Sequence, residues 1–129
     1  MAIPYLCILV AAFLPYLWVA ISKASGHRYD NRDPRGWLAK QESPRAHRAN
    51  SAQLNAFEAF APFAASVLMA QLAGVNPGTI TALSLVFVAA RIVHGLFYLA
   101  NRALYRSLVW GVGYVCVLAL MALSILKLI

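Results

Sequence analysis

Four long apolar runs, separated by polar or charged segments of which the first is long, constrain this chain more than any other feature. The runs cover approximately residues 3–22, 50–74, 79–100 and 105–128. Each is close to the length of about 20 residues that a helix needs to cross a bilayer. Because lipid offers the backbone no hydrogen-bond partners, all four should be helices. We therefore predict an all-α, integral membrane four-helix bundle in which residues 1–129 form a single domain.

The composition argues against a soluble domain. Hydrophobic residues make up 62% of the 129 residues and charged residues only 12%, whereas soluble domains carry about 25% charged residues. The net charge of +7 would suggest a nucleic-acid partner in a soluble protein. Here the cations lie in patches between the apolar runs, so the lipid bilayer is the expected partner and nucleic acid is not.

The cationic residues are distributed unevenly between the two sides of the membrane. Seven Lys and Arg residues lie from Lys23 to Arg48, and two more, Arg102 and Arg106, lie in the third connection at about residues 101–106, but residues 74–78 carry none. Cytoplasmic loops are enriched in Lys and Arg. The loop at about residues 23–44 is therefore predicted to be cytoplasmic. Both termini are then expected on the periplasmic side, most simply of a bacterial inner membrane.

The second helix is expected to begin before its apolar run. Ser43 and Pro44 are a typical cap and first-turn residue of a helix. This start would make Arg45 to Asn55 a cytoplasmic extension of the membrane helix.

Ionisable residues inside the apolar runs are the candidates for function. On the second helix, Arg48, Asn55 and Glu58 fall within about 80° of arc at 100° per residue, and Glu58 is the only acid in any run. On the third, Arg91, His94, Tyr98 and Arg102 follow at i, i+3, i+7 and i+11, which predicts a second polar stripe. Arg106, at the start of the fourth helix, should lie at the same depth.

Two explanations of these residues stay open. Arg91 could be a structural counter-ion of Glu58, and Tyr98, Arg102 and Arg106 could be interface anchors. However, one carboxylate needs only one cation, and ionisable residues within a membrane are functional candidates by default. Surplus arginine suggests a ligand with carboxylates, and a lone acid suits an ammonium group on the same ligand. The pattern thus predicts a small zwitterion that enters from the cytoplasm.

Other kinds of site have no sequence support. Cys7 and Cys116 are isolated within apolar runs, and the three histidines have no metal-ligand spacing. We therefore predict no metal site. The sequence also lacks a glycine-rich phosphate loop, a GxSxG motif and paired catalytic carboxylates.

The polar residues resemble those of one known family. Asn55-x-x-Glu58 followed by Pro62, with Arg45-Ala-His-Arg48 before it, is similar to the second helix of the MAPEG proteins (membrane-associated proteins in eicosanoid and glutathione metabolism). The segment Ala90 to Trp110 resembles that family's third and fourth helices, with Arg-x-x-His-x-x-x-Tyr and then Arg-Ser. In the first loop, "YDNRDPRGWL" resembles the bacterial branch.

The resemblance implies a homotrimer of four-helix bundles that binds glutathione, as a cosubstrate, between neighbouring subunits. Asn55 and Glu58 would contact the glutamyl end of glutathione. Arg48, Arg91, His94 and Tyr98 would hold its carboxylate and backbone groups, and Arg106 would stabilise the thiolate. The implied function is a glutathione-dependent transferase or peroxidase, of the microsomal transferase type, acting on small lipophilic electrophiles or hydroperoxides.

The sequence departs from the family pattern at a few positions. Ser51 and Leu54 stand where eukaryotic members often have further basic residues, and Trp110 replaces a tyrosine of some eicosanoid enzymes. Some members of the family are not enzymes, so a non-catalytic binding or scaffold protein is the alternative. A small four-helix multidrug transporter fits less well, because its key acid lies in the first span, where this chain has none.

Overall fold

The computed structural model describes all residues from 1 to 129, and its secondary-structure elements are all helices, which confirms the predicted all-α class. It contains four long helices and one short one. They are α1 (Ala2–Ala24), α2 (Pro34–Ala39), α3 (Pro44–Leu72), α4 (Pro77–Leu99) and α5 (Ala103–Leu128). The short helix α2, within the first loop, was not predicted from the sequence.

Three of the helices begin with a capping side chain followed by proline. Ser43 caps α3, as predicted, by accepting a hydrogen bond from the backbone N–H of Ala46. Asn76 caps α4 and Asp33 caps α2 in the same way. Proline suits the next position because its missing N–H would have no partner within the helix. These caps fix where each helix starts after a loop.

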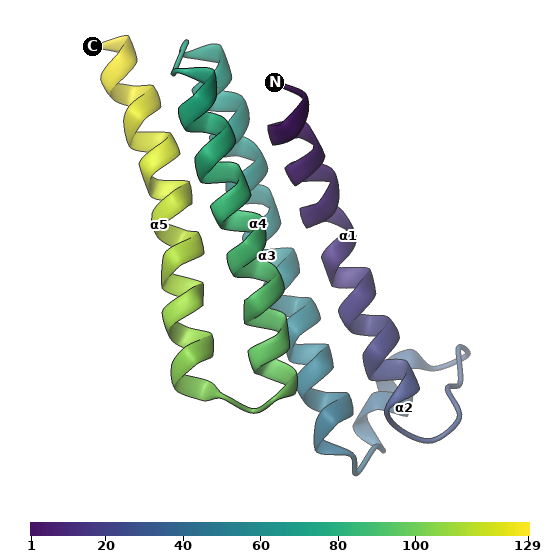
Figure 1. Cartoon of the computed structure of the whole chain (residues 1–129). Helices are drawn as coiled ribbons and strands as arrows, with labels where there is room; N and C mark the ends of the chain where they lie inside the picture. Colours follow the sequence, from purple (N-terminus) through teal and green to yellow (C-terminus); the bar gives the residue numbers. More distant parts are fainter.

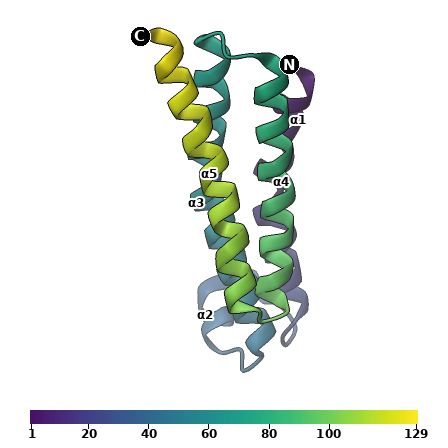
Figure 2. The same cartoon turned by 60° about the vertical axis from the view of Figure 1, so that its left-hand side comes forward.

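The four long helices run alternately down and up the molecule (Figure 1). Helix α1 packs against α3 and α4, and α5 packs against α4 and α3. Both termini consequently lie at one end, while α2 and the first loop lie at the other, as a view turned by 60° also shows (Figure 2). The Tyr5 hydroxyl donates a hydrogen bond to the Gln71 side chain and so ties α1 to α3 near the terminal end.

The exterior of the four long helices is apolar, and several polar groups are inside. Leu9, Phe13 and Val115 are each more than 60% exposed, whereas Arg91 and His94 are buried. Helices α1, α4 and α5 are long and apolar enough to cross a membrane. Helix α3 is not among them, because polar residues extend far into it. Together these features indicate an integral membrane protein.

The first loop is held by its own hydrogen bonds. Buried Gln41 accepts a hydrogen bond from the backbone N–H of His27 and donates one to the carbonyl of Trp37, both at 2.8 Å. The Trp37 indole N–H in turn donates to the Arg28 carbonyl at 3.0 Å. These bonds hold the segment that follows α1 against α2 and the segment that precedes α3.

Close helix packing at one glycine leads to a stability prediction. A β-carbon at Gly95 of α4 would lie 2.0 Å from the Trp18 ring of α1, whereas one at Gly111 of α5 would meet nothing within 4 Å. Gly95→Ala should therefore lower the free energy of unfolding, by about 1–3 kcal/mol if it behaves as an overpacked core. Gly111→Ala is the matched control and should be neutral or stabilising, since alanine favours helix. Thermal unfolding in mild detergent measures both, and equal melting temperatures would contradict the prediction.

Candidate functional site

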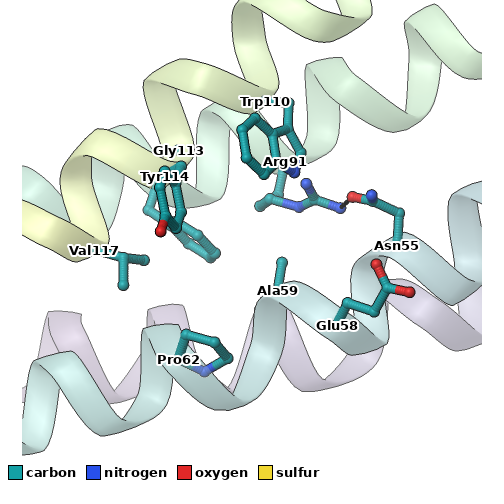
Figure 3. Close-up of a pocket in the computed structure, with 10 residues that line it drawn as sticks. Asn55, Glu58, Ala59, Pro62, Arg91, Trp110, Gly113, Tyr114 and Val117 are labelled. Atoms are coloured by element: carbon teal, nitrogen blue, oxygen red, sulfur yellow. Dashed lines mark hydrogen bonds between the residues drawn. The ribbon is translucent and has the colours of Figure 1, made fainter.

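An apolar pocket lies between α3, α4 and α5 in the half of the bundle nearer the first loop. Its volume is about 140 Å³. Helix α3 supplies Asn55, Glu58, Ala59 and Pro62, α4 supplies Phe87 and Arg91, and α5 supplies Trp110, Gly113, Tyr114 and Val117. Figure 3 shows how these side chains surround the space, with the polar ones toward one end. We call it the apolar pocket.

A second pocket adjoins the first and is mostly polar. It is lined by Asn55 of α3, by two residues of α4 and by three of α5, namely His94, Tyr98, Arg106, Ser107 and Trp110. Asn55 and Trp110 line both pockets, so the two spaces share a boundary. We call the second space the polar pocket. Six of the seven predicted site residues line one or both pockets.

Arg91 and Asn55 are joined by a hydrogen bond between α4 and α3. Arg91 Nη2 donates to Asn55 Oδ1 at 2.7 Å (Figure 3). Because this bond occupies the amide oxygen, the Asn55 amide nitrogen is left to donate to other groups. The sequence suggested that both residues contact a ligand directly. The structure adds that Arg91, which is only 4% exposed, orients Asn55.

Glu58 forms no direct ion pair within this chain. The only ion pair of the structure joins Arg32 to Asp30 in the first loop, with 3.0 Å between the nitrogen and the oxygen. No direct ion pair joins Arg91 to Glu58 in this chain, although the two charges are close enough to interact. The Glu58 side chain is exposed at the rim of the apolar pocket. A carboxylate without a direct ion pair, in the part of a helix expected within the membrane, is a candidate for binding a cationic group from outside the chain.

Arg106 is placed by an aromatic ring rather than by an acid. Its guanidinium carbon lies 4.3 Å from the centre of the Tyr98 ring, a distance typical of a cation–π contact. Tyr98 meets His94 edge to face, with 5.4 Å between the ring centres. The His94 Nδ1 atom is buried and has no hydrogen-bond partner. The polar pocket thus combines a cation without a bound acid and an unused imidazole nitrogen.

Two arginines of the predicted cluster lie elsewhere. Helix α4 ends at Leu99 and Asn101 adopts a positive φ of 56°. Arg102 therefore lies at the N-terminal boundary of α5, without a capping hydrogen bond from its side chain, and is exposed, so the prediction that it continues the α4 stripe is wrong. Arg48 is half-buried on α3 and lines neither pocket. Its Nε atom is buried without a partner.

Sequence reasoning missed the contribution of α5 beyond Arg106. Ser107, Trp110, Tyr114 and Val117 line the pockets, and their spacing of three and four residues places them on one face of a helix. That spacing was visible in the sequence. It carried no signal because aromatic and aliphatic residues are equally expected on a face that meets lipid.

The family of the chain follows from a comparison with known protein families. The sequence profile of the MAPEG family matches residues 3–126. The chain belongs to the MAPEG family. A search of curated proteins returned no match. Membership confirms the resemblance seen in the sequence and places this membrane protein among those concerned with glutathione or eicosanoid metabolism.

Proteins of the MAPEG family use glutathione, and the two pockets hold charged and polar groups that can be compared with those of this molecule. Glutathione carries two carboxylates, one ammonium and one thiol. The two pockets together present the guanidinium groups of Arg91 and Arg106, the carboxylate of Glu58 and the amide of Asn55. No group of three or more His, Cys, Asp or Glu side chains in the structure could hold a metal ion.

Proposed function

We propose that this protein is a glutathione-dependent membrane transferase or peroxidase. In this proposal, the thiolate of glutathione forms in the polar pocket. The observation that carries the proposal is the free guanidinium of Arg106, held over Tyr98 in a pocket that adjoins an apolar one. A free thiol has a pKa of about 8.5, and a nearby cation lowers it. The chain thus offers one place for a charged thiolate and another for a lipophilic partner.

The chemistry needs only glutathione and the second substrate. In a transfer, the thiolate sulfur forms a bond to an electrophilic carbon, and the leaving group departs with the electron pair of its bond. In a peroxidase reaction, two glutathione thiols reduce one hydroperoxide to an alcohol and water and become a disulfide. Arg106 would stabilise the sulfur anion in both, in the manner of an electrostatic clamp.

The remaining predicted residues would bind glutathione. Glu58 would accept the ammonium group, and Asn55, oriented by Arg91, would donate its amide N–H to a carboxylate or carbonyl oxygen. His94 and Tyr98 would line the thiol end of the polar pocket. Arg48 would reach glutathione only in an assembly, because it lines neither pocket in one chain.

We also propose that the protein spans the membrane four times and assembles as a homotrimer. The exposed Glu58 at a pocket rim favours a site completed by a neighbouring subunit. A mass measurement in mild detergent should then give three chains.

A non-catalytic scaffold of the same fold is the second candidate. The hydrogen bond between Arg91 and Asn55 favours it, because such a bond between helices would also serve a purely structural role. A scaffold would not, however, need Arg106 to be free of an acid.

Titration of glutathione into the purified protein separates the two candidates. A transferase should bind glutathione and show the ultraviolet absorbance of a thiolate at neutral pH. It should also conjugate a generic aryl halide. S-methylglutathione is the matched control, since it can occupy the site without forming a thiolate. Binding without thiolate and without conjugation would support the scaffold instead.

The proposed orientation can be tested with single cysteines. In a variant without Cys7 and Cys116, which are both free and buried, a cysteine at exposed Asn31 in the first loop should resist an impermeant thiol reagent in intact cells. A cysteine at Ile129, which is 96% exposed at the opposite end, should react. Permeabilised cells should label both. Labelling of Asn31→Cys in intact cells would reverse the orientation.

A further inference from the structure

We propose that the first loop lies in the headgroup layer of the membrane and binds anionic phospholipids there. The inference needs the chain to span the membrane, as proposed above, but it does not depend on glutathione. The surface concerned consists of five exposed cations at the end of the bundle that carries the first loop. We call it the cationic collar, and its members are Arg28, Arg35, Lys40, Arg45 and Arg102.

The length of α1 places its last turn at the edge of the hydrocarbon. The helix has 23 residues, which makes it about 35 Å long at 1.5 Å per residue, whereas the hydrocarbon core is about 30 Å thick. A helix of this length that crosses the core therefore reaches the headgroups at both of its ends. Lys23, in the last turn of α1, lies at this depth.

The first loop folds back beside this last turn instead of extending away from the bundle. In both views the loop and α2 lie at the height of the last turns of α1 (Figures 1 and 2). Lys23 Nζ lies 4.4 Å from the centre of the Tyr29 ring, and Tyr29 meets Trp37 edge to face, with 5.2 Å between the ring centres. These contacts hold the loop at the depth of the headgroups, where aromatic residues are typical.

The charge of the collar is not neutralised within the chain. Residues 23–48 contain seven cations but only three acids. Asp30 is already paired with Arg32, and Asp33 accepts a hydrogen bond from the Gly36 N–H as the cap of α2. No ion pair joins a residue of the collar to an acid. Clusters of Lys and Arg beside a membrane helix attract anionic lipid headgroups, and the collar is such a cluster.

An apolar surface that continues from the collar favours a lipid over a soluble acidic partner. The outward face of α5 consists of apolar residues that are 47–63% exposed and follow at spacings of three and four, namely Tyr105, Leu108, Val112 and Val115. Arg102 lies at the foot of this face, just before α5 begins. A phospholipid matches both parts, because its acyl chains suit the apolar face and its phosphate suits the arginine.

Native mass spectrometry in mild detergent can measure the binding of single lipid molecules to the purified protein. The wild type should bind phosphatidylglycerol at least tenfold more tightly than phosphatidylcholine with the same acyl chains. Each cation near an anionic surface contributes a factor of about five in affinity. The triple variant Arg28→Gln, Arg35→Gln, Lys40→Gln should therefore bind phosphatidylglycerol at least tenfold more weakly, while its Kd for phosphatidylcholine changes less than twofold. An equal Kd of the wild type for the two lipids would overturn the proposal.

Two control variants separate the collar from charge elsewhere. The double variant Asp30→Asn, Arg32→Gln removes the ion pair of the same loop and leaves the net charge unchanged. Lys127→Gln removes an exposed cation at the opposite end of the bundle. Both should change the Kd of phosphatidylglycerol less than twofold. A variant with Arg28→Lys and Arg35→Lys should keep the wild-type preference, and its loss there would show that the charge of the collar does not bind the lipid.

Two soluble anions distinguish a lipid from other partners at constant ionic strength. Glycerol 1-phosphate carries the phosphate without acyl chains, and polyglutamate represents the acidic surface of a protein. Neither should displace phosphatidylglycerol from the wild type. Displacement by either one would assign the collar to a soluble partner and overturn the proposal.

The position of the loop can be measured in vesicles. A spin label on Asn31→Cys, in a variant without Cys7 and Cys116, reports how readily a neutral, water-soluble nickel chelate reaches the loop. Accessibility should be at least twofold lower in vesicles of mixed phosphatidylglycerol and phosphatidylcholine than in phosphatidylcholine alone. The triple glutamine variant should lose this difference. Equal accessibility of the wild-type loop in the two kinds of vesicle would contradict its binding to anionic headgroups.

Discussion

Arg106→Ala should lower the turnover of conjugation by about 10²–10³-fold, the usual effect of removing one electrostatic stabiliser of a reacting anion. The affinity for glutathione should fall much less. Arg106 lies over the Tyr98 ring with no acid bound to it, so its charge is available to the sulfur. In the mutant, the thiol would regain a pKa near its ordinary value, and little thiolate would exist at neutral pH.

Single-turnover kinetics and the ultraviolet absorbance of the thiolate measure this effect separately from binding. Arg106→Lys should keep part of the thiolate signal, because it keeps the charge but not the flat guanidinium that stacks on Tyr98. Arg102→Ala, four residues earlier and exposed, is the matched control and should behave like wild type. Raising the pH should partly rescue Arg106→Ala, since hydroxide then removes the proton. A mutant with normal turnover would exclude Arg106 from the chemistry.

Glu58→Gln should weaken glutathione binding by at least tenfold. Hydrogen bonds to charged groups contribute about 1.5–3 kcal/mol, and each 1.4 kcal/mol is a factor of ten in Kd. Glu58 forms no direct ion pair within the chain, so the mutation breaks no such contact. The loss should therefore appear in ligand binding rather than in the free energy of unfolding.

A glutathione analogue without the ammonium group tests the role of Glu58 itself. The wild type should prefer glutathione to this deaminated analogue, and Glu58→Gln should bind both with similar affinity. Glu42→Gln, at an exposed position of the first loop, is the control for a general change in charge. Calorimetric titration gives all the affinities. An equal preference for glutathione in wild type and Glu58→Gln would contradict the assignment of Glu58 to the ammonium group.

The helices were predictable because each carries its own signal. Apolar length predicted the long helices, and Ser43 with Pro44 predicted where α3 begins. The short α2 was missed because Pro34–Ala39 is only six residues long and contains both proline and glycine. The position of Arg102 was predicted wrongly because the end of α4 depends on Asn101. This residue has a positive φ, which no pattern in the sequence indicates.

The site was only half predictable, and the reason is physical. Charged residues in a membrane helix stand out, so the polar members of the site were found. The bond between Arg91 and Asn55 joins residues 36 positions apart, and it depends on how far α4 is shifted along α3. Trp110 and Tyr114 were not found, because a pocket between helices and a surface against lipid select the same side chains.

The two chain ends lie at the same end of the bundle (Figure 1), and this makes genetic fusion of copies feasible. A flexible linker from Ile129 of one copy to Met1 of the next would need to run along one end of the bundle only. A tandem gene could then carry Glu58→Gln in one copy and Arg106→Ala in another. If a site draws these two residues from different copies, the order of the mutated copies in the fusion will decide how many intact sites survive.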